Sequence, residues 1–503
     1  METSLEFWDF LILIVYLLGI VALGSYFARG IKTSEDFFLA GRSFSWFPLG
    51  LSIIVSLMSA NSFLGIPGYS YGHDLQLIAM TPLMLPIMFI VIYFFLPTFY
   101  RFRVTTAYEY LERRLGAGSR LLATCLFLLT RLGWLGTVIY VPCVPLSRVA
   151  GISLELCVVS VGVGATLYTV LGGMKAVVWT DVVQFFVLIG GLVVMVVTLV
   201  ENVDGGALGI WEKASAGGRT TLIQFEGDLF SDTTIWAILI GSIAAYLADY
   251  GADQVALQRY FSARSLKDSQ RSILCNAVAV IPLVLLLGAV GLGLFAFYQQ
   301  SPEQLEAGIE KDHVMVFFAA TQLPPGFAGL MIAAIFATTM SSVDSGINSM
   351  STACVVDIYR RWIHPPVGTE LEELSAQEKG SELTLARGLT AFWGIVGTAM
   401  ALFVMPHAGS IVLMSVKVMG LFTGPLLGIF LLALFTRKTR DLPCLSGALA
   451  GWSITAYLAF ATEMTFWWWS PLGCTITVLV GWILSVLTSR PPAAQQEQVQ
   501  STL

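Results

Sequence analysis

Charged residues are scarce in this chain, and that scarcity argues against a soluble fold. Only 12% of the 503 residues are Asp, Glu, Lys or Arg, whereas 56% are hydrophobic. A soluble domain usually carries about twice that share of charge. The net charge of −6 comes from acidic loops, so the composition gives no reason to expect a nucleic-acid partner.

Cysteine and histidine are also sparse. The seven cysteines are an odd number and lie mostly inside or beside apolar segments, so we interpret them as packing residues and not as a disulfide or zinc framework. The histidines lie in or near predicted loops without clustering: His73, His313, His364 and His407. A membrane enzyme with a metal or nucleophilic centre is therefore disfavoured. No small-residue cleavage site follows the first apolar run, so we expect no cleaved signal peptide.

Long apolar segments are abundant instead. A helix needs about 20 mostly apolar residues to cross a lipid bilayer. About thirteen segments meet this requirement, at 7–28, 45–70, 77–99, 119–144, 152–171, 176–200, 235–260, 272–298, 325–357, 382–404, 410–436, 442–462 and 466–488. We therefore predict an all-α polytopic membrane protein with about 13 transmembrane helices, folded as a single domain over 1–503.

Lys and Arg are distributed unevenly among the gaps. Twenty-one of the 27 fall in alternate gaps, and the intervening gaps hold only Arg148, Lys213, Arg219 and Lys311. Because basic loops stay on the cytoplasmic side, we expect a plasma (inner) membrane protein with its N-terminus outside and its C-terminus in the cytoplasm. The same pattern assigns Arg259 to a cytoplasmic gap, whereas Arg131 and Lys417 lie within spans.

Polar residues inside a membrane are costly, so their positions are informative about function. Segment 45–70 carries Ser52, Ser56, Ser59, Asn61 and Ser62 at mid-depth, followed by Gly65, Pro67 and Gly68. Gly and Pro weaken helical hydrogen bonding, and broken helices in transporters line ion and substrate sites. A kinked helix packed through small residues is the alternative.

Segment 325–357 carries a second polar cluster at three- and four-residue steps, composed of Thr338, Ser341, Ser342, Ser345, Asn348, Ser349 and Thr352. At about 100° per residue these side chains form one narrow stripe. Hydroxyl and carbonyl oxygens suit a hard cation such as Na+ better than a transition metal. Asp344 lies beside the stripe, and Asp181 would approach it if segment 176–200 packs against segment 325–357.

Segment 235–260 contains Asp249, Tyr250 and Gly251. This segment and segment 45–70 are five spans apart, and both are interrupted by glycine. Corresponding interruptions in two halves indicate an inverted repeat with its site at the repeat interface. The repeats would be 45–200 and 235–436, with an extra helix at 7–28, two C-terminal helices at 442–488 and a short cytoplasmic tail at 489–503.

Several long motifs resemble the sodium:solute symporter family, which includes the sodium/glucose, sialic acid and monocarboxylate/multivitamin cotransporters. They are LGGMKAVVWTDVVQ (171–184), DQVALQRYFSAR (253–264), AAIFATTMSSVDSGINS (333–349), TAYEYLERR (106–114) and DFFLAGR (36–42). The resemblance extends over about residues 8–436. It implies a leucine-transporter-like fold with two inverted five-helix repeats, alternating access, and Na+ as the coupling ion.

The resemblance also implies ion ligands at matching positions. One sodium ion would bind the carbonyl oxygens of Val55, Met58 and Thr338 and the hydroxyls of Ser341 and Ser342. A second, which some members hold nearer the cytoplasm, would use Asp181, Ser342, Asp344 and Ser345. Family members carry Ser or Thr at the position of Asp344. The added carboxylate leaves open a second sodium, a proton, or a structural pairing of Asp344 with Lys417 or a backbone donor.

For the substrate, the positions that match the sialic acid branch are Ser59, Ala60, Ser62, Thr81 and Trp134. The Gln and Arg of that branch are replaced here by Thr81 and Trp134, so we do not expect sialic acid. Arg131, one turn from Trp134, and Asp249 are further candidates for substrate binding, and Lys417 is a candidate charge partner. The motif around Lys175 is most similar to the monocarboxylate and multivitamin branch, which favours small organic anions.

These observations predict a secondary transporter and not an enzyme. The predicted function is sodium-coupled symport of a small organic solute, with a carboxylate as one option. A symporter for a sugar, an amino acid or a compatible solute and a proton-coupled carrier are alternatives. A channel belongs to a different class, and the sequence offers it no ring-forming filter.

Overall fold

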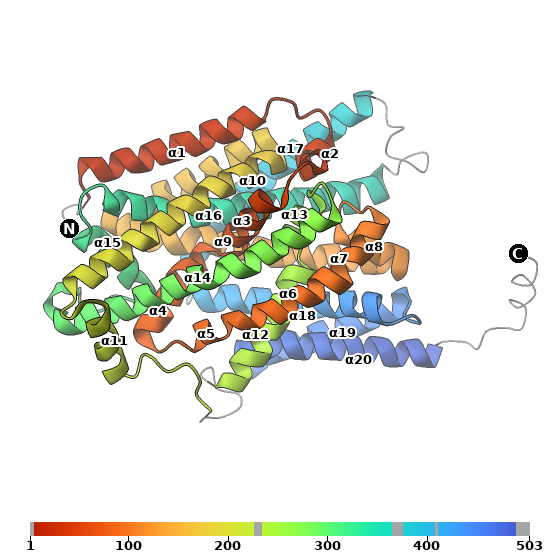
Figure 1. Ribbon diagram of the computed structural model, residues 1–503. Helices are drawn as coiled ribbons and strands as arrows, with labels where there is room; N and C mark the ends of the chain where they lie inside the picture. The colour runs from red at the N-terminus through yellow and green to blue at the C-terminus, as the bar shows by residue number, and fades with distance from the viewer. Residues whose placement is uncertain (1–4, 226–233, 365–375, 408–410, 489–503) are drawn as a thin grey trace, which may run out of the picture.

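The computed structural model describes residues 5–225, 234–364, 376–407 and 411–488, and the side chains of 376–378 and 411–418 are outside that description. Over these residues the chain is a bundle of helices (Figure 1), and the isolated bridge between Phe44 and Ala263 is the one β pairing that they contain.

The first half of the bundle contains ten α-helices: α1 (Phe7–Phe27), α2 (Ser34–Leu39), α3 (Trp46–Leu57), α4 (Ala60–Gly72), α5 (Gln76–Ala79), α6 (Met84–Ile90), α7 (Leu96–Phe102), α8 (Ala107–Arg114), α9 (Ala117–Ala150) and α10 (Leu154–Asn202). The second half contains α11 (Gly206–Ala216), α12 (Ile235–Gly251), α13 (Gln254–Phe261), α14 (Leu266–Gln300), α15 (Val314–Gln322), α16 (Phe327–Ala353), α17 (Ala376–Phe403), α18 (Ile411–Phe435), α19 (Asp441–Ala461) and α20 (Trp469–Thr488). Short 3-10 turns are η1 (Ala40–Arg42), η2 (Thr81–Leu83), η4 (Pro302–Gln304), η5 (Lys311–His313), η8 (Met405–His407) and η9 (Phe466–Trp468), and π-helical segments are η3 (Val91–Phe95) and η6 (Cys354–Ile363).

Among the described residues, nine helices are long and apolar enough to cross a membrane, or eleven if each of two bent helix pairs is one span. The pairs are α3 with α4, bent by 65°, and α12 with α13, bent by 43°. The predicted count of thirteen is not confirmed. One reason is that α10 runs for 49 residues through two predicted segments. The other is that the part of α18 considered, Met419–Phe435, is too short to be counted as a span.

The ends of the helical bundle differ in the elements that they carry. In Figure 1, α2 and α8 lie at the end where α20 finishes, whereas α11 lies at the other end, where α1 begins. The described chain therefore starts and finishes at opposite ends of the bundle. The short helices α11 and α15 lie between predicted spans, α11 after segment 176–200 and α15 after segment 272–298.

The first broken helix interrupts its backbone at a different place from the one that glycine and proline indicated. Helix α3 ends at Leu57, and Met58 (φ −81°, ψ 81°) and Ser59 (φ −69°, ψ 163°) leave the helical conformation before α4 begins. Pro67 and Gly68 lie inside α4 instead. Gly68 allows a close approach, because a Cβ there would lie 2.3 Å from an Asp312 carboxylate oxygen.

The second break agrees with its sequence signal. Helix α12 ends at Gly251, and Asp253 is extended and caps α13 by accepting a hydrogen bond of 2.8 Å from the Val255 amide. Both breaks lie within the bundle, where neighbouring helices cover the backbone groups that they free.

A sharp turn divides α10. Gly173 adopts φ 51° and ψ −149° in the middle of the helix. A Cβ at this position would lie 2.5 Å from the carbonyl oxygen of Phe37. Because residues with a side chain rarely adopt this backbone conformation, the turn depends on glycine.

Gly173→Ala is therefore expected to destabilise the protein, because the new methyl group meets both the backbone strain, about 1–3 kcal/mol, and the contact with Phe37. Gly190→Ala is the matched control in the same helix, since a Cβ there meets nothing closer than Leu330 at 3.9 Å. Thermal unfolding in detergent should give a lower melting temperature for Gly173→Ala alone. Equal melting temperatures for the two variants would contradict this account of the turn.

Candidate functional site

Oxygen atoms from two helices converge at the break between α3 and α4. The Ser341 hydroxyl on α16 lies 3.0 Å from the Val55 carbonyl oxygen and 3.1 Å from the Thr338 carbonyl oxygen. All three residues are buried. Of the five positions predicted to hold a sodium ion, Ser341 is therefore in contact with two others, Val55 and Thr338.

The other two predicted ligands border the same place. Met58 lies in the break itself. The Ser342 hydroxyl is buried and has no hydrogen-bond partner among the described residues. Leaving a buried polar group without a partner costs about 1–3 kcal/mol. A cation bound beside Ser342 would remove that cost, so the donor set fits a hard monovalent ion such as sodium.

The predicted second set of ligands is arranged around a guanidinium group. Asp181 accepts hydrogen bonds from the Ser52 hydroxyl (2.5 Å), the Ser56 hydroxyl (3.2 Å) and Arg259 Nη2 (3.1 Å). Arg259 also donates to the Ser345 hydroxyl (2.5 Å) and, through Nε, to the Ser52 hydroxyl (2.8 Å). A positive charge from the chain therefore lies between Asp181 and Ser345.

The burial of Arg259 was not expected from its place in a basic gap. The loop pattern placed Arg259 in a cytoplasmic gap, whereas its side chain is 1% exposed. The reason is that α13 packs against α3 and α16, so this arginine lies inside the bundle. Arg120 is a second such case, since it is buried and its Nε donates to Asp357 at 2.8 Å.

Asp344 has a different partner from those considered in the sequence. Its carboxylate accepts hydrogen bonds from the Tyr168 hydroxyl (2.6 Å) on α10 and from the Ser345 hydroxyl (2.9 Å). The Lys417 side chain lies outside the described residues. Helix α10 packs along α16, which was the condition for Asp181 to approach the polar stripe.

The C-terminal half of the polar stripe, from Asn348 to Thr352, makes contacts with α13. The Gln258 amide nitrogen donates to the Asn348 side-chain oxygen (2.7 Å) and the Thr352 hydroxyl (2.9 Å), and its oxygen accepts from the Ser349 hydroxyl (2.8 Å). These three stripe residues hold α13 against α16. The predicted ion ligands of α16 all lie in the N-terminal half of the stripe, from Thr338 to Ser345.

A cavity of about 300 Å³ adjoins the break. Three of the seven substrate candidates, Ser62, Thr81 and Asp249, are among its lining residues, and the sodium-site candidate Met58 lines it too. Four other candidates are not among its lining residues: Ser59, Ala60, Arg131 and Trp134.

Arg131 has an acidic partner inside the protein. It forms an ion pair with Asp253, and its guanidinium carbon lies 4.6 Å from the centre of the Trp134 ring. The sequence had suggested Arg131 as a candidate for substrate binding. Since its charge is already compensated, Arg131 is not a free receptor for a carboxylate.

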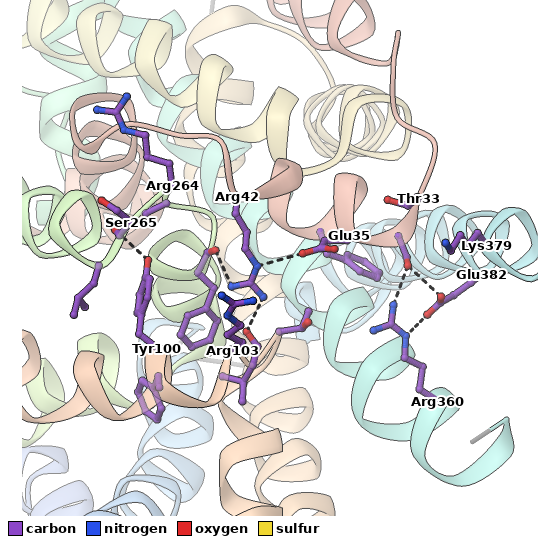
Figure 2. Close-up of a pocket in the computed structure, with 18 residues that line it drawn as sticks. Thr33, Glu35, Arg42, Tyr100, Arg103, Arg264, Ser265, Arg360, Lys379 and Glu382 are labelled. Atoms are coloured by element: carbon purple, nitrogen blue, oxygen red, sulfur yellow. Dashed lines mark hydrogen bonds and ion pairs between the residues drawn. The ribbon is translucent and has the colours of Figure 1, made fainter. Parts of the chain in front are cut away.

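A second cavity, of about 570 Å³, opens at the end of the bundle that carries α2 (Figure 2). Arg42 contacts Glu35 (3.2 Å) and the Val104 carbonyl oxygen (3.2 Å). Arg360 pairs with Glu382 on α17 and donates to the Ser34 hydroxyl (2.8 Å). These contacts tie α2 and η1 to the segments after α7 and after α16.

Comparison with known proteins identifies the class. The model of the sodium:solute symporter family matches residues 37–454, and the chain belongs to this family. The sodium/sialic acid symporter SiaT of Proteus mirabilis is 31% identical over 497 residues, which cover 97% of this chain and 96% of that protein. The human sodium/iodide cotransporter is 31% identical over 463 residues, 91% of this chain and 70% of the relative.

Solved structures agree with that assignment. A substrate-bound, outward-open Na+-coupled sialic acid symporter matches with a TM-score of 0.89 and 29% identity over 96% of this chain and 98% of that one. The nucleobase-cation symporter Mhp1, at 12% identity and a TM-score of 0.56 over 94% of this chain and 99% of its own, shares the fold. The chain is thus a sodium-coupled symporter of small organic solutes with a leucine-transporter-like fold, and it is not an enzyme.

The buried pair of Asp181 and Arg259 should be strongly coupled. Removing either partner leaves an uncompensated charge, which costs about 3–5 kcal/mol. Asp181→Asn and Arg259→Gln should each lower the melting temperature in detergent, and the double variant should lose less than the sum of the two. Arg264→Gln is the control, because that side chain is 61% exposed beside Asp268 and should change stability little. Additive losses in the double variant would show that the pair is not coupled.

Proposed function

We propose that Val55, Met58, Thr338, Ser341 and Ser342 bind the sodium ion that drives uptake in this chain. The convergence of Ser341 with the Val55 and Thr338 carbonyl oxygens is the observation that carries the proposal. An ion at this point would bridge α16 to the broken helix α3–α4. Sodium binding would therefore favour one arrangement of these helices, which is what coupling to a solute in the adjoining cavity requires.

We also propose that Asp344 binds a second cation, either a sodium ion or a proton. Asp181 and Asp344 are both buried, and Arg259 contacts only Asp181 of the two. A buried carboxylate without a compensating charge is costly. Asp344 would therefore take either a second sodium ion, with Ser342 and Ser345, or a proton. Arg259 already contacts Asp181 and Ser345, so a second sodium would have to share these ligands with it.

The side of the membrane on which the solute leaves follows from the proposed orientation of the chain. We propose that the chain lies in the plasma membrane with the end that carries α2 and α8 in the cytoplasm. The alternation of basic gaps supports this orientation, and so does the location of the start of α1 and the end of α20 at opposite ends of the bundle. The cavity lined by Arg42 and Arg360 would then be the inner vestibule through which the solute leaves.

The sodium site is tested by Ser341→Ala combined with Ser342→Ala. Loss of two hydroxyl ligands is expected to raise the sodium concentration for half-maximal uptake several-fold in proteoliposomes, with less effect on the amount of folded protein. Ser349→Ala is the matched control, because that hydroxyl contacts Gln258 and lies outside the proposed ion ligands. Uptake that proceeds equally when potassium replaces sodium in the buffer would contradict sodium coupling and favour a proton-coupled carrier. Uptake that fails to saturate would favour a channel.

The role of Asp344 is tested by charge-to-solute stoichiometry between about pH 5.5 and 8. The native protein is expected to move one more charge per solute than Asp344→Ser, or to exchange sodium for a proton as the pH falls. In Asp344→Ser the Tyr168 hydroxyl loses the shorter of its two hydrogen bonds, so Tyr168→Phe is measured alongside to separate that loss. Identical stoichiometry and pH profiles for native protein and Asp344→Ser would remove Asp344 from the coupling mechanism.

A further inference from the structure

The cavity beside the broken helices carries a single kind of charge. Among its described lining residues, Asp249 is the charged one. The others are apolar, aromatic or hydroxyl-bearing. No Lys, Arg or His belongs to this lining. The electrostatic field inside the cavity is therefore set by one carboxylate.

Asp249 has no direct partner among the described residues. No hydrogen bond or ion pair joins it to another residue whose side chain the structure describes, and its side chain is partly exposed where it lines the cavity. Arg131, the nearby cation, is paired with Asp253 and stacked on Trp134. A carboxylate at membrane depth without a partner is costly, which indicates that a ligand supplies the positive charge.

The aromatic lining is suited to the same kind of ligand. Tyr246, Tyr250 and Trp467 line the cavity together with Asp249. Aromatic faces attract ammonium groups through the ring quadrupole, and recognition of quaternary ammonium by such rings is a recurring device. The hydroxyl-bearing residues Ser62 and Thr81 would hold polar atoms elsewhere on the solute.

We propose that this symporter selects an organic ammonium solute, either an amine or a quaternary ammonium, with Asp249 as the counter-charge. The proposal rests on the sodium-coupled function above and names its substrate class. An organic anion would bring its negative charge next to Asp249 with no cation among the described lining side chains to offset the repulsion. The anions named for the relatives, such as sialic acid and iodide, are therefore not expected to bind here.

The geometry also connects the solute to sodium. Met58 belongs to the proposed sodium ligands and lines the cavity as well. A solute at Asp249 and an ion at the break would therefore both lie beside Met58. Asp249→Asn should therefore weaken solute binding while leaving sodium binding at Ser341 in place, which separates the two proposals experimentally.

The test uses the full-length protein in detergent and its thermal unfolding. Choline and glycine betaine are the ammonium probes, and pyruvate and N-acetylneuraminate are the anion probes. Each probe is measured in sodium and in potassium chloride. The native protein is expected to be stabilised by sodium, and further by at least one ammonium probe but by neither anion. Asp249→Asn should weaken the apparent affinity for that probe at least tenfold and keep the stabilisation by sodium alone.

Two variants keep the result interpretable. Asp249→Glu retains the charge and should retain measurable binding, and Asp204→Asn removes an exposed acid outside the cavity and should change nothing. Preferential stabilisation by the anions, or none by either ammonium probe, would overturn the inference. Stabilisation by an ammonium probe that is identical in sodium and potassium would instead overturn the sodium-coupled function while leaving Asp249 as the receptor.

Discussion

The ion pair between Arg259 and Asp181 is the interaction on which the centre of this protein depends. Isolated charges are costly inside a membrane, so a buried arginine must be paired and hydrogen-bonded. Here its partners come from α3, α10 and α16, through Ser52, Asp181 and Ser345. Since α13 carries the arginine, four helices from distant parts of the chain are fixed to one point.

This point lies directly beside the proposed sodium site. Ser56 contacts Ser345, while the preceding residue, Val55, contacts Ser341 one turn along α16. The same stretch of α3 thus faces the ion pair with one residue and the sodium ligands with the next. A movement of the broken helix that changes one set of contacts must change the other, because the two sets share a backbone segment.

Several parts of this arrangement could be predicted from the sequence because they repeat along it. The polar stripe in segment 325–357 has helical spacing, and Gly251 marks the second break. The first break could not be located in this way, since Met58 and Ser59 adopt conformations that are open to many residue types. Gly68 was a misleading signal, because it provides space for Asp312 and not for a change of direction.

The burial of Arg259 and the partner of Arg131 could not be predicted from the sequence, for a different reason. Counting cations by gap gives the side of the membrane, but it does not tell whether a particular side chain turns inward. Arg259 stands eight residues after Gly251, and only the packing of α13 against α3 and α16 shows that its side chain points into the bundle. Likewise, the sequence named Arg131 as a cation within a span without giving its partner, which the fold supplies as Asp253.

The break between α12 and α13 explains how two nearby acids acquire separate roles. Asp249 and Asp253 are four residues apart, and in an unbroken helix they would lie on the same face. Because the helix ends at Gly251 and resumes at Gln254, Asp253 instead caps the new helix and pairs with Arg131. Asp249 stays on the old helix and lines the cavity. The interruption thus leaves Asp253 to stabilise the fold and Asp249 to bind the solute. Loss of the Asp253 charge should therefore affect stability, whereas loss of the Asp249 charge should affect solute binding.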